Sequence, residues 1–234
     1  MSSILLILLS PPVQGVVWTQ LSPSVWQGRN CISDEEADAI TRLANLSDPT
    51  ADLESNYPTV HEFLVQDDPA AWKIRRLMAN ISRLPLVNAK ELFVLEYRAG
   101  MVSKVGQSMP HYDWTCRDEF IACDRARAIT SLTYLNSNAF GETKLPKQNI
   151  TVEAKKGDCV LFWNIQEDGH GVWRKNMEAQ HFGNPIKDGR KLVAVQWIRW
   201  KHSPLNQSEK DCEESGCGPW ISLRNAFHKY RSEL

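Results

Sequence analysis

The sequence lacks the features that mark several large classes of protein. Its 234 residues contain no long apolar run, no internal repeat and no low-complexity segment. Acidic and basic residues nearly balance, giving a net charge of -1, and they are mixed along the chain. The absence of a basic face argues against a nucleic-acid partner, and the absence of a long apolar run argues against a membrane span.

The composition fits a single globular domain. The chain is long enough for one well-buried domain and too short for two ordinary ones. Apolar residues make up 42% and charged residues 24%, as in soluble proteins. Nine tryptophans are many for this length. They predict an aromatic core, because large aromatic side chains mostly serve packing, with an aromatic-walled cavity as the alternative.

The two ends of the chain bear on its compartment. Residues 4–9 form a short apolar run typical of a signal peptide, and we interpret residues 1–29 as a leader segment. The last four residues, 231–234, approximate an endoplasmic-reticulum retrieval signal, although an ordinary charged C-terminus is the alternative. Four N-glycosylation sequons also favour the secretory pathway. They begin at Asn45, Asn80, Asn149 and Asn206.

The six cysteines include two closely spaced pairs, Cys116/Cys123 and Cys212/Cys217. Each pair suits a short disulfide loop in an oxidising compartment, although separate reduced thiols fit the spacing as well. Together with the ends of the chain, these pairs predict the lumen of the endoplasmic reticulum or the secretory pathway.

The hydrophobic pattern changes along the chain from helical to strand-like. A capping box at residues 33–36 predicts a helix over 34–45, and Asp68-Pro69 opens a second helix over 69–84. Residues 46–67 are predicted as loop. After residue 90, alternating stretches predict strands. These stretches are residues 91–98, 128–135, 158–163 and 191–200.

Two helices followed by strands predict an α+β fold with a jelly-roll core, a double-stranded β-helix against which the N-terminal helices pack. We expect one domain over residues 30–200 and a polar, cysteine-containing tail over 201–234.

His111-Tyr112-Asp113 is a candidate metal-binding motif. In an extended segment, residues two apart project to the same side, so His111 and Asp113 would share one space. A second histidine would complete a triad that leaves three positions open on iron(II). His181, just before a predicted strand, is well placed for that role. A surface histidine beside an aspartate is the common alternative, and a zinc hydrolase site is another.

Lys191 lies on the predicted strand in the same phase as Val193, Val195 and Trp197. A lysine on an apolar strand face is costly unless a partner neutralises it. The distal carboxylate of a bound 2-oxoglutarate would be such a partner. An edge-strand lysine that prevents aggregation is the alternative.

From Tyr97 to Trp197 the sequence resembles the catalytic domain of the prolyl 4-hydroxylases. The matching pieces come in the family's order and at about its spacing. They are Tyr97 with Gly100, His111-Tyr112-Asp113, Tyr134-Leu135-Asn136, Gly141-Glu142-Thr143, Lys156-Gly157-Asp158, Leu161-Phe162-Trp163-Asn164, His181, Lys191 and Trp197.

The resemblance implies an iron(II)- and 2-oxoglutarate-dependent dioxygenase that uses dioxygen and L-ascorbate. It would hydroxylate peptidyl proline in proline-rich or collagen-like polypeptides, coupled to decarboxylation of 2-oxoglutarate to succinate. Lys191 would pair with the distal carboxylate of 2-oxoglutarate, with Tyr97 and Thr143 as hydroxyl partners and Trp197 as a wall of the site. The implied metal ligands are His111, Asp113 and His181.

The sequence also departs from the family pattern. The segment 101–110 is longer than expected, with Ser108 where the family has tyrosine, and Phe140 replaces the first glycine of Gly-Gly-Glu-Thr. These changes affect the expected shape of the substrate groove. Two alternatives therefore stand beside the prolyl substrate. One is an oxygenase for lysyl residues or small molecules, and the other is a catalytically silent jelly-roll binding module.

Overall fold

A computed structural model describes residues 15–46, 59–63, 68–99, 109–116, 121–123 and 126–200. These residues form three antiparallel sheets and two α-helices, so the predicted α+β class is confirmed at the level of elements. Neither helix is long and apolar enough to cross a membrane.

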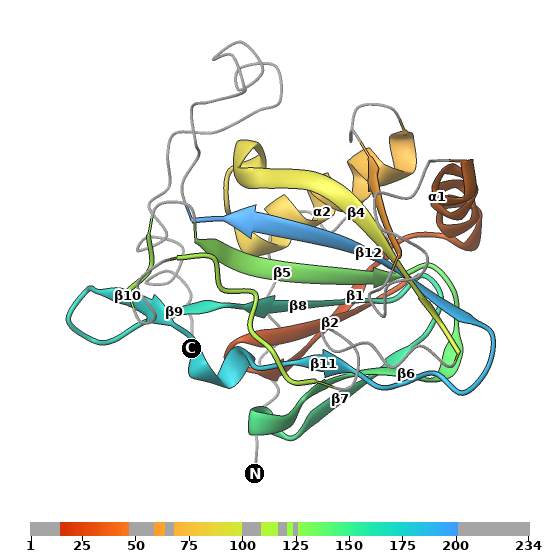
Figure 1. The fold of residues 1–234 in the computed structure, drawn as a ribbon. Coiled ribbons are helices and arrows are strands. Elements are labelled where there is room, and N and C mark those ends of the chain that lie inside the picture. Colours follow the sequence, from red (N-terminus) through yellow and green to blue (C-terminus); the bar gives the residue numbers. More distant parts are fainter. Residues whose placement is uncertain are drawn as a thin grey trace.

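The largest sheet has seven strands, paired antiparallel in the order β1-β2-β8-β5-β12-β4-β3 (Figure 1). In chain order they are β1 (Val17–Ser22), β2 (Val25–Arg29), β3 (Thr59–Phe63), β4 (Ala89–Arg98), β5 (Arg127–Tyr134), β8 (Cys159–Trp163) and β12 (Arg190–Arg199). The four predicted strands correspond to β4, β5, β8 and β12 and are confirmed.

Both helices begin at the residues that the sequence indicates. Helix α1 (Asp34–Leu46) starts with the capping box, in which Glu36 N donates to Ser33 Oγ and Ser33 N donates to a Glu36 carboxylate oxygen. Helix α2 (Pro69–Ser82) starts at Asp68, whose Oδ1 accepts from the N–H groups of the first turn. These caps satisfy backbone donors that have no partner within the helix.

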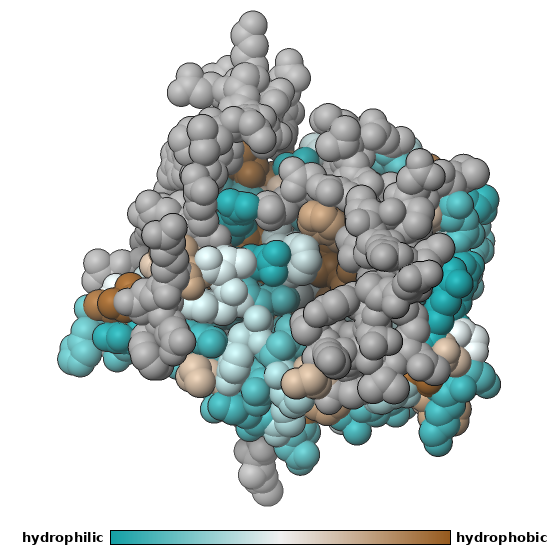
Figure 2. All heavy atoms as spheres, in the orientation of Figure 1, coloured by the Kyte–Doolittle hydropathy of each residue, from teal (hydrophilic) through white to brown (hydrophobic). Residues whose placement is uncertain are grey.

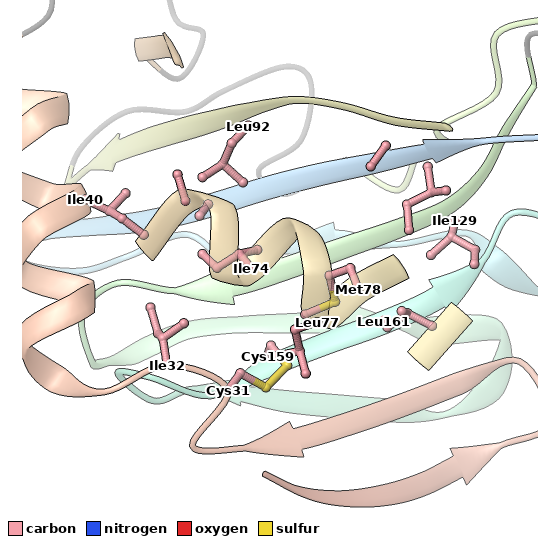
Figure 3. Packing of buried hydrophobic residues seen from close by; sticks show 14 of the residues in the cluster. Cys31, Ile32, Ile40, Ile74, Leu77, Met78, Leu92, Ile129, Cys159 and Leu161 are labelled. Atoms are coloured by element: carbon pink, nitrogen blue, oxygen red, sulfur yellow. A yellow bond between two sulfur atoms is a disulfide. The ribbon is translucent and has the colours of Figure 1, made fainter. Parts of the chain in front are cut away.

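The helices cover one face of the large sheet and form the main core with it. Figure 3 shows Ile74 and Met78 of α2 and Ile40 of α1 pointing toward the strands, where they meet side chains such as Leu92 and Ile129. Each of these five side chains is at most 1% exposed. Burying an aliphatic side chain of this size contributes about 1.5–3 kcal/mol, so this layer holds the large sheet in place.

A second, smaller sheet lies on the other side of the large one. It pairs β6 (Asn138–Leu145) with β7 (Ile150–Ala154) and β11 (Phe182–Gly183), in the order β11-β6-β7. A two-stranded ribbon of β9 (Ile165–Glu167) and β10 (Trp173–Lys175) extends from the end of β8. A second core cluster includes buried side chains of both larger sheets, among them Tyr134, Leu145 and Phe162.

Successive side chains of strand β12 point to opposite faces of the large sheet, so the strand contributes to both core clusters. Leu192, Ala194 and Ile198 belong to the helix-side cluster, whereas Val193 and Val195 belong to the cluster on the opposite face. The predicted phase of this strand is therefore confirmed. It places functional candidates on the face away from the helices.

The turn before β8 depends on glycine. Gly157 has a φ of +82°, and a Cβ atom at this position would lie 2.7 Å from the carbonyl oxygen of Ile32. A side chain is excluded both by the backbone conformation and by this close approach. The predicted turn at Lys156-Gly157-Asp158 is thus confirmed, and Cys159 begins the strand.

Two predicted boundaries are corrected. The sequence predicts a leader up to residue 29, but residues 17–29 form β1 and β2, so the folded part begins before residue 30. It predicts a loop over residues 46–67, but Thr59–Phe63 forms β3 at the edge of the large sheet. The tail over 201–234 lies outside the described residues. Strand propensity depends strongly on the surrounding sheet, so the five residues of β3 give too weak a local signal to be predicted.

The disulfides confirm one predicted pair and add another. Cys116 is bonded to Cys123, as the spacing suggests, and Cys31 is bonded to Cys159 across 128 residues of sequence. The long-range bond joins the end of the β1–β2 hairpin to β8 (Figure 3). The pair Cys212/Cys217 lies outside the described residues.

The surface seen in Figure 2 carries apolar side chains in small separate groups among polar ones. Large apolar side chains that are exposed among the described residues lie on different elements. They are Val17, Met109, Ile121, Phe140, Val172 and Met177. Scattered apolar residues of this kind are ordinary on a protein surface.

Candidate metal centre and adjoining pocket

His111 and His181 are brought together by backbone pairing. They form an isolated antiparallel bridge, with His111 N donating to His181 O at 2.9 Å and His181 N donating to His111 O at 3.0 Å. Their ring centroids lie 4.3 Å apart. His181 follows the short 3-10 helix Met177–Ala179 and immediately precedes β11. The bridge thus places two imidazoles from distant parts of the sequence side by side.

Asp113 completes the group, as the two-residue spacing predicts. One ligand atom from each of His111, Asp113 and His181 can be chosen so that all three lie within 4.8 Å of one another. Asp113 and His181 are buried, at 9% and 5% exposed, and His111 is partly exposed. The three residues can therefore converge on one ion that remains reachable from outside.

The histidine rings are oriented by main-chain carbonyl groups. Nδ1 of His181 lies 3.0 Å from Ala179 O, and Nδ1 of His111 lies 3.3 Å from Met109 O. A proton on Nδ1 satisfies each contact and leaves the lone pair of Nε2 free. Both Nε2 atoms face the Asp113 carboxylate. Nε2 of His181 lies 3.7 Å from Oδ2, and Nε2 of His111 lies 4.0 Å from Oδ1.

The charge states of the buried groups suit metal binding. Burial lowers the pKa of His181, so its imidazole stays neutral near pH 7 as a ligand must be. Burial alone would raise the pKa of Asp113, but the neighbouring histidines and hydrogen bonds from Thr130 and Trp197 outweigh it and hold that pKa below the usual value. Asp113 therefore remains an anion.

Three residues around Asp113 are not anticipated from the sequence. The Thr130 hydroxyl donates to Asp113 Oδ2 at 2.6 Å, and Asn164 Nδ2 donates to Thr130 Oγ1 at 2.8 Å. Nη1 of Arg127 lies 3.8 Å from Asp113 Oδ1. The alternation of β5 places Thr130 on the face of Tyr134, and this is the one local signal that could have identified it.

Trp197 lies beside the triad, as the family resemblance implies. Its indole N–H donates to Asp113 Oδ2 at 2.9 Å, and the guanidinium carbon of Arg127 lies 3.7 Å from the centroid of its ring. Phe93 lies next to it, with ring centroids 5.2 Å apart. The aromatic residues therefore serve both predicted roles, because Trp163 is buried in the core whereas Trp197 borders the candidate site.

Lys191 is buried beside the rings of two tyrosines on the same face of β12. It is 4% exposed, and its Nζ lies 5.7 Å and 5.6 Å from the ring centroids of Tyr97 and Tyr134. Within the described part of the chain, no carboxylate lies at ion-pair distance from it. Burial lowers its pKa to about 8. A buried lysine with no carboxylate at ion-pair distance is suited to bind an anionic ligand.

The residues near Lys191 also include those whose hydroxyl groups the resemblance implies. Tyr134 donates to Thr143 Oγ1 at 2.9 Å, and Tyr97 pairs with Lys191 across β4 and β12. Burial and the charge of Asp113 raise the pKa of Tyr97. Tyr134 matches the family motif, but the sequence does not predict that it lines the pocket.

Gly141 fits closely against the buried lysine. A Cβ atom at this position would lie 2.9 Å from Cδ of Lys191, so a larger residue would displace the lysine side chain. Phe140, which replaces a family glycine, is 38% exposed and lies against Lys187 rather than inside the pocket. Residues 101–108 of the long segment before the triad are outside the described ranges.

Comparisons with known proteins agree with this arrangement. No family model matches the chain. The chain is 28% identical over 207 residues to prolyl 4-hydroxylase subunit alpha-2 of Gallus gallus, covering 82% of this chain and 36% of the relative. It is 28% identical over 211 residues to subunit alpha-1 of Homo sapiens, covering 82% and 37%. The chain thus spans little more than a third of these relatives.

A solved structure shows the same fold. The viral collagen prolyl hydroxylase of Paramecium bursaria Chlorella virus-1 superposes with a TM-score of 0.61 and 23% sequence identity, covering 75% of this chain and 89% of that one. The sequence matches confirm the resemblance drawn from the motifs: over 82% of its length the chain is similar to the alpha subunits of prolyl 4-hydroxylases.

Proposed function

We propose that the protein is an iron(II)- and 2-oxoglutarate-dependent dioxygenase that hydroxylates peptidyl proline. The observation that carries this proposal is the pairing of two features on one sheet face. One is the convergent group of His111, Asp113 and His181, and the other is the buried Lys191, which has no carboxylate at ion-pair distance among the described residues. The names of the relatives support the same reaction.

The donor set fits iron(II). Two neutral imidazoles and one carboxylate on one side of an octahedral ion leave three adjacent positions free. Iron(II) in such a site supplies the activation of dioxygen that the protein's own side chains lack. His111, Asp113 and His181 would hold the ion, and the main-chain contacts of the two Nδ1 atoms would keep the rings in place.

The lysine pocket fits the distal carboxylate of 2-oxoglutarate. Lys191 would form the ion pair, and the hydroxyl groups of Tyr97 and Thr143 would donate to the remaining carboxylate lone pairs. Tyr134 would orient the Thr143 hydroxyl through the hydrogen bond at 2.9 Å. Because the pocket is buried, this ion pair would be weakly screened and would select strongly for an anion.

Aromatic walls would exclude water from the reacting groups. The Phe162 ring lies 4.5 Å from that of His181, and Phe93 packs on Trp197. A site lined in this way favours transfer of oxygen to a bound substrate over loss to solvent. Substrate would approach from the side of His111, which is the most exposed member of the group.

The proposed substrate is a proline-rich or collagen-like polypeptide. Such chains adopt polyproline II at low entropic cost and bind surfaces lined by aromatic residues. The relatives named prolyl 4-hydroxylase support proline over lysyl residues or small molecules. L-Ascorbate is proposed as the reductant that keeps the iron divalent.

We also propose a specific type of β-fold and a cellular compartment for the protein. We infer a double-stranded β-helix, supported by the facing antiparallel sheets and the viral relative, within a domain that extends from the first described strands to about residue 200. The lumen of the endoplasmic reticulum is supported by the two disulfides, which persist in oxidising compartments.

The test is release of succinate from 2-oxoglutarate by the full chain with iron(II) and ascorbate, with and without a proline-rich peptide. Succinate that depends on iron and rises with the peptide supports the proposal, and the His181→Ala variant should release none. Zinc-supported hydrolysis without succinate would establish the hydrolase alternative. Absence of any turnover would leave a binding module and contradict the proposal.

A further inference from the structure

The two oxygens of the Asp113 carboxylate have different surroundings. Oδ2 accepts hydrogen bonds from Thr130 Oγ1 at 2.6 Å and from Trp197 Nε1 at 2.9 Å. Oδ1 accepts no hydrogen bond from a described residue and lies 3.8 Å from Nη1 of Arg127 and 4.0 Å from Nε2 of His111. Oδ2, which also lies 3.7 Å from Nε2 of His181, is thus held by two hydrogen bonds, whereas Oδ1 accepts none from the described residues.

The direction of the Thr130 hydroxyl is set by Asn164. Thr130 Oγ1 accepts from Asn164 Nδ2 at 2.8 Å, and a hydroxyl has a single proton to donate. Because the amide can only donate in this contact, the Thr130 proton is directed to Asp113. Thr130 is fully buried and Asn164 is 4% exposed, so water does not compete for these bonds.

Asn164 is itself fixed by the backbone. Its main-chain N–H donates to Ala128 O at 2.8 Å, and its main-chain carbonyl accepts from Asn176 N at 2.8 Å. These bonds hold the backbone of Asn164 at the end of β8, next to β5, and the hydrogen bond to Thr130 is made by its side-chain Nδ2. Two successive buried hydrogen bonds, from Asn164 to Thr130 and from Thr130 to Asp113, therefore end on one carboxylate oxygen.

We propose that Thr130, oriented by Asn164, is a positioning residue that makes Asp113 a one-oxygen metal ligand through Oδ1. This inference rests on the proposed metal role of Asp113. If Oδ2 were free, the carboxylate could bind the ion through both oxygens and occupy an additional position. The proposed reaction needs three open positions, two for the oxoacid and one for dioxygen.

Strand β5 offers a matched control. Thr133 is also fully buried, but its side chain points to the opposite face of the strand from that of Thr130. Its hydroxyl has no hydrogen-bond partner within the described part of the chain. Replacing either threonine by valine keeps the side-chain shape and removes one hydroxyl, so the two variants differ in what that hydroxyl contacts.

The experiment measures binding of cobalt(II) to the full chain, by its dissociation constant and its visible absorption spectrum. Thr130→Val is expected to weaken binding by about 10- to 100-fold and to alter the spectrum, because the ligand geometry changes. Thr130→Ser, which keeps the hydroxyl, should restore both, and Thr133→Val should match the wild type. Thr130→Val with wild-type affinity and spectrum would overturn the inference.

A second variant covers a failure of Thr130→Val to fold. Trp197→Phe removes the other donor to Oδ2 and keeps an aromatic ring at a partly exposed position. It should change the cobalt spectrum in the same direction, and an unchanged spectrum would overturn the inference. Wild-type protein that binds no cobalt would instead contradict the proposed function. Loss of thermal stability without a spectral change would reduce Thr130 to a structural role and also overturn the inference.

Discussion

His111 and His181 lie directly opposite each other and exchange two backbone hydrogen bonds, at 2.9 and 3.0 Å. This pairing sets the separation of the two imidazoles before any ion binds, and the carbonyl groups of Met109 and Ala179 set their tautomers. A preorganised site of this kind needs little rearrangement to accept a metal.

Metal should therefore stabilise the folded protein, and the gain in unfolding free energy should grow with the logarithm of the free ion concentration. At a free ion concentration of about 100 times the dissociation constant, the gain is about 2.7 kcal/mol. For a domain of this size the melting temperature should rise by about 5–10 °C, as thermal unfolding with and without iron(II) would measure. His181→Ala should abolish the rise. An equal rise in this variant would place the metal elsewhere.

Lys191 should make stability depend on pH in the protein without ligand. Its pKa is about 8 in the folded protein against an ordinary value of 10.5 for an exposed lysine, so between these values the unfolded chain binds more protons. Stability should rise with pH across that window, and below pH 8 the buried charge costs on the order of 3 kcal/mol. Denaturant unfolding at pH 7 to 10 measures this. Lys191→Met should be more stable at pH 7 and lack the rise, and an unchanged pH profile would contradict the burial of a charged lysine.

Binding of 2-oxoglutarate should weaken with rising pH, whereas the stability of the ligand-free protein should increase, and both effects come from Lys191. Because a carboxylate pairs only with protonated Lys191, the KM for 2-oxoglutarate should increase as pH rises above about 8. Lys191→Ala should raise the KM at pH 7 and leave metal affinity nearly unchanged. Steady-state kinetics at several pH values provide the measurement. A KM insensitive to this substitution would remove Lys191 from the pocket's function.

Gly141→Ala tests the fit of the pocket. The added Cβ would lie 2.9 Å from Cδ of Lys191, so the lysine must shift. Overpacking of this kind costs about 1–3 kcal/mol, and the same amount lost from ligand binding would raise the KM for 2-oxoglutarate by about 5- to 150-fold. Ala139→Ser, at the exposed neighbouring position, is the control and should be silent. Equal kinetics in the two variants would show that the lysine moves without consequence.

The two disulfides should differ in their contribution to stability. The Cys31–Cys159 bond spans 128 residues, whereas the Cys116–Cys123 bond spans seven. On the chain-entropy model, loss of the first should cost about 5 kcal/mol and loss of the second about 2.5 kcal/mol. Unfolding of the Cys31→Ser and Cys116→Ser variants in denaturant compares them. A larger loss for the short loop would contradict the view that the first bond anchors the N-terminal hairpin.

The sequence predicts those features of the site that follow from local periodicity. The two-residue spacing of His111 and Asp113, and the phase of Lys191 with Val193, follow from strand geometry and reappear in the fold. The pairing of Asn164 with Thr130 depends on which strands become neighbours, and neither residue carries a local signal for it. The family resemblance supplies the functional roles, because periodicity alone cannot distinguish a metal ligand from a surface histidine.

The contrast between local periodicity and long-range pairing also explains which elements of the fold are predicted wrongly. The helices and main strands have strong hydrophobic patterns, so their predicted bounds are close to those observed. Residues 17–29 follow an apolar N-terminal run, and for this reason they are predicted as part of a leader. Their place in the sheet depends on the pairing of β2 with β8 and on the disulfide between Cys31 and Cys159. Long-range pairing of this kind is not encoded in any short window.

The most direct test of the proposed function follows isotopically labelled dioxygen in a reaction with iron(II), 2-oxoglutarate and a proline-rich peptide. The proposal predicts one labelled oxygen atom in the succinate and one in a hydroxyproline of the peptide, with both absent in His181→Ala. Label in succinate with an unmodified peptide would retain the oxygenase and reject the peptidyl-proline substrate. Hydroxyproline that carries oxygen from water, or no succinate at all, would contradict the central claim.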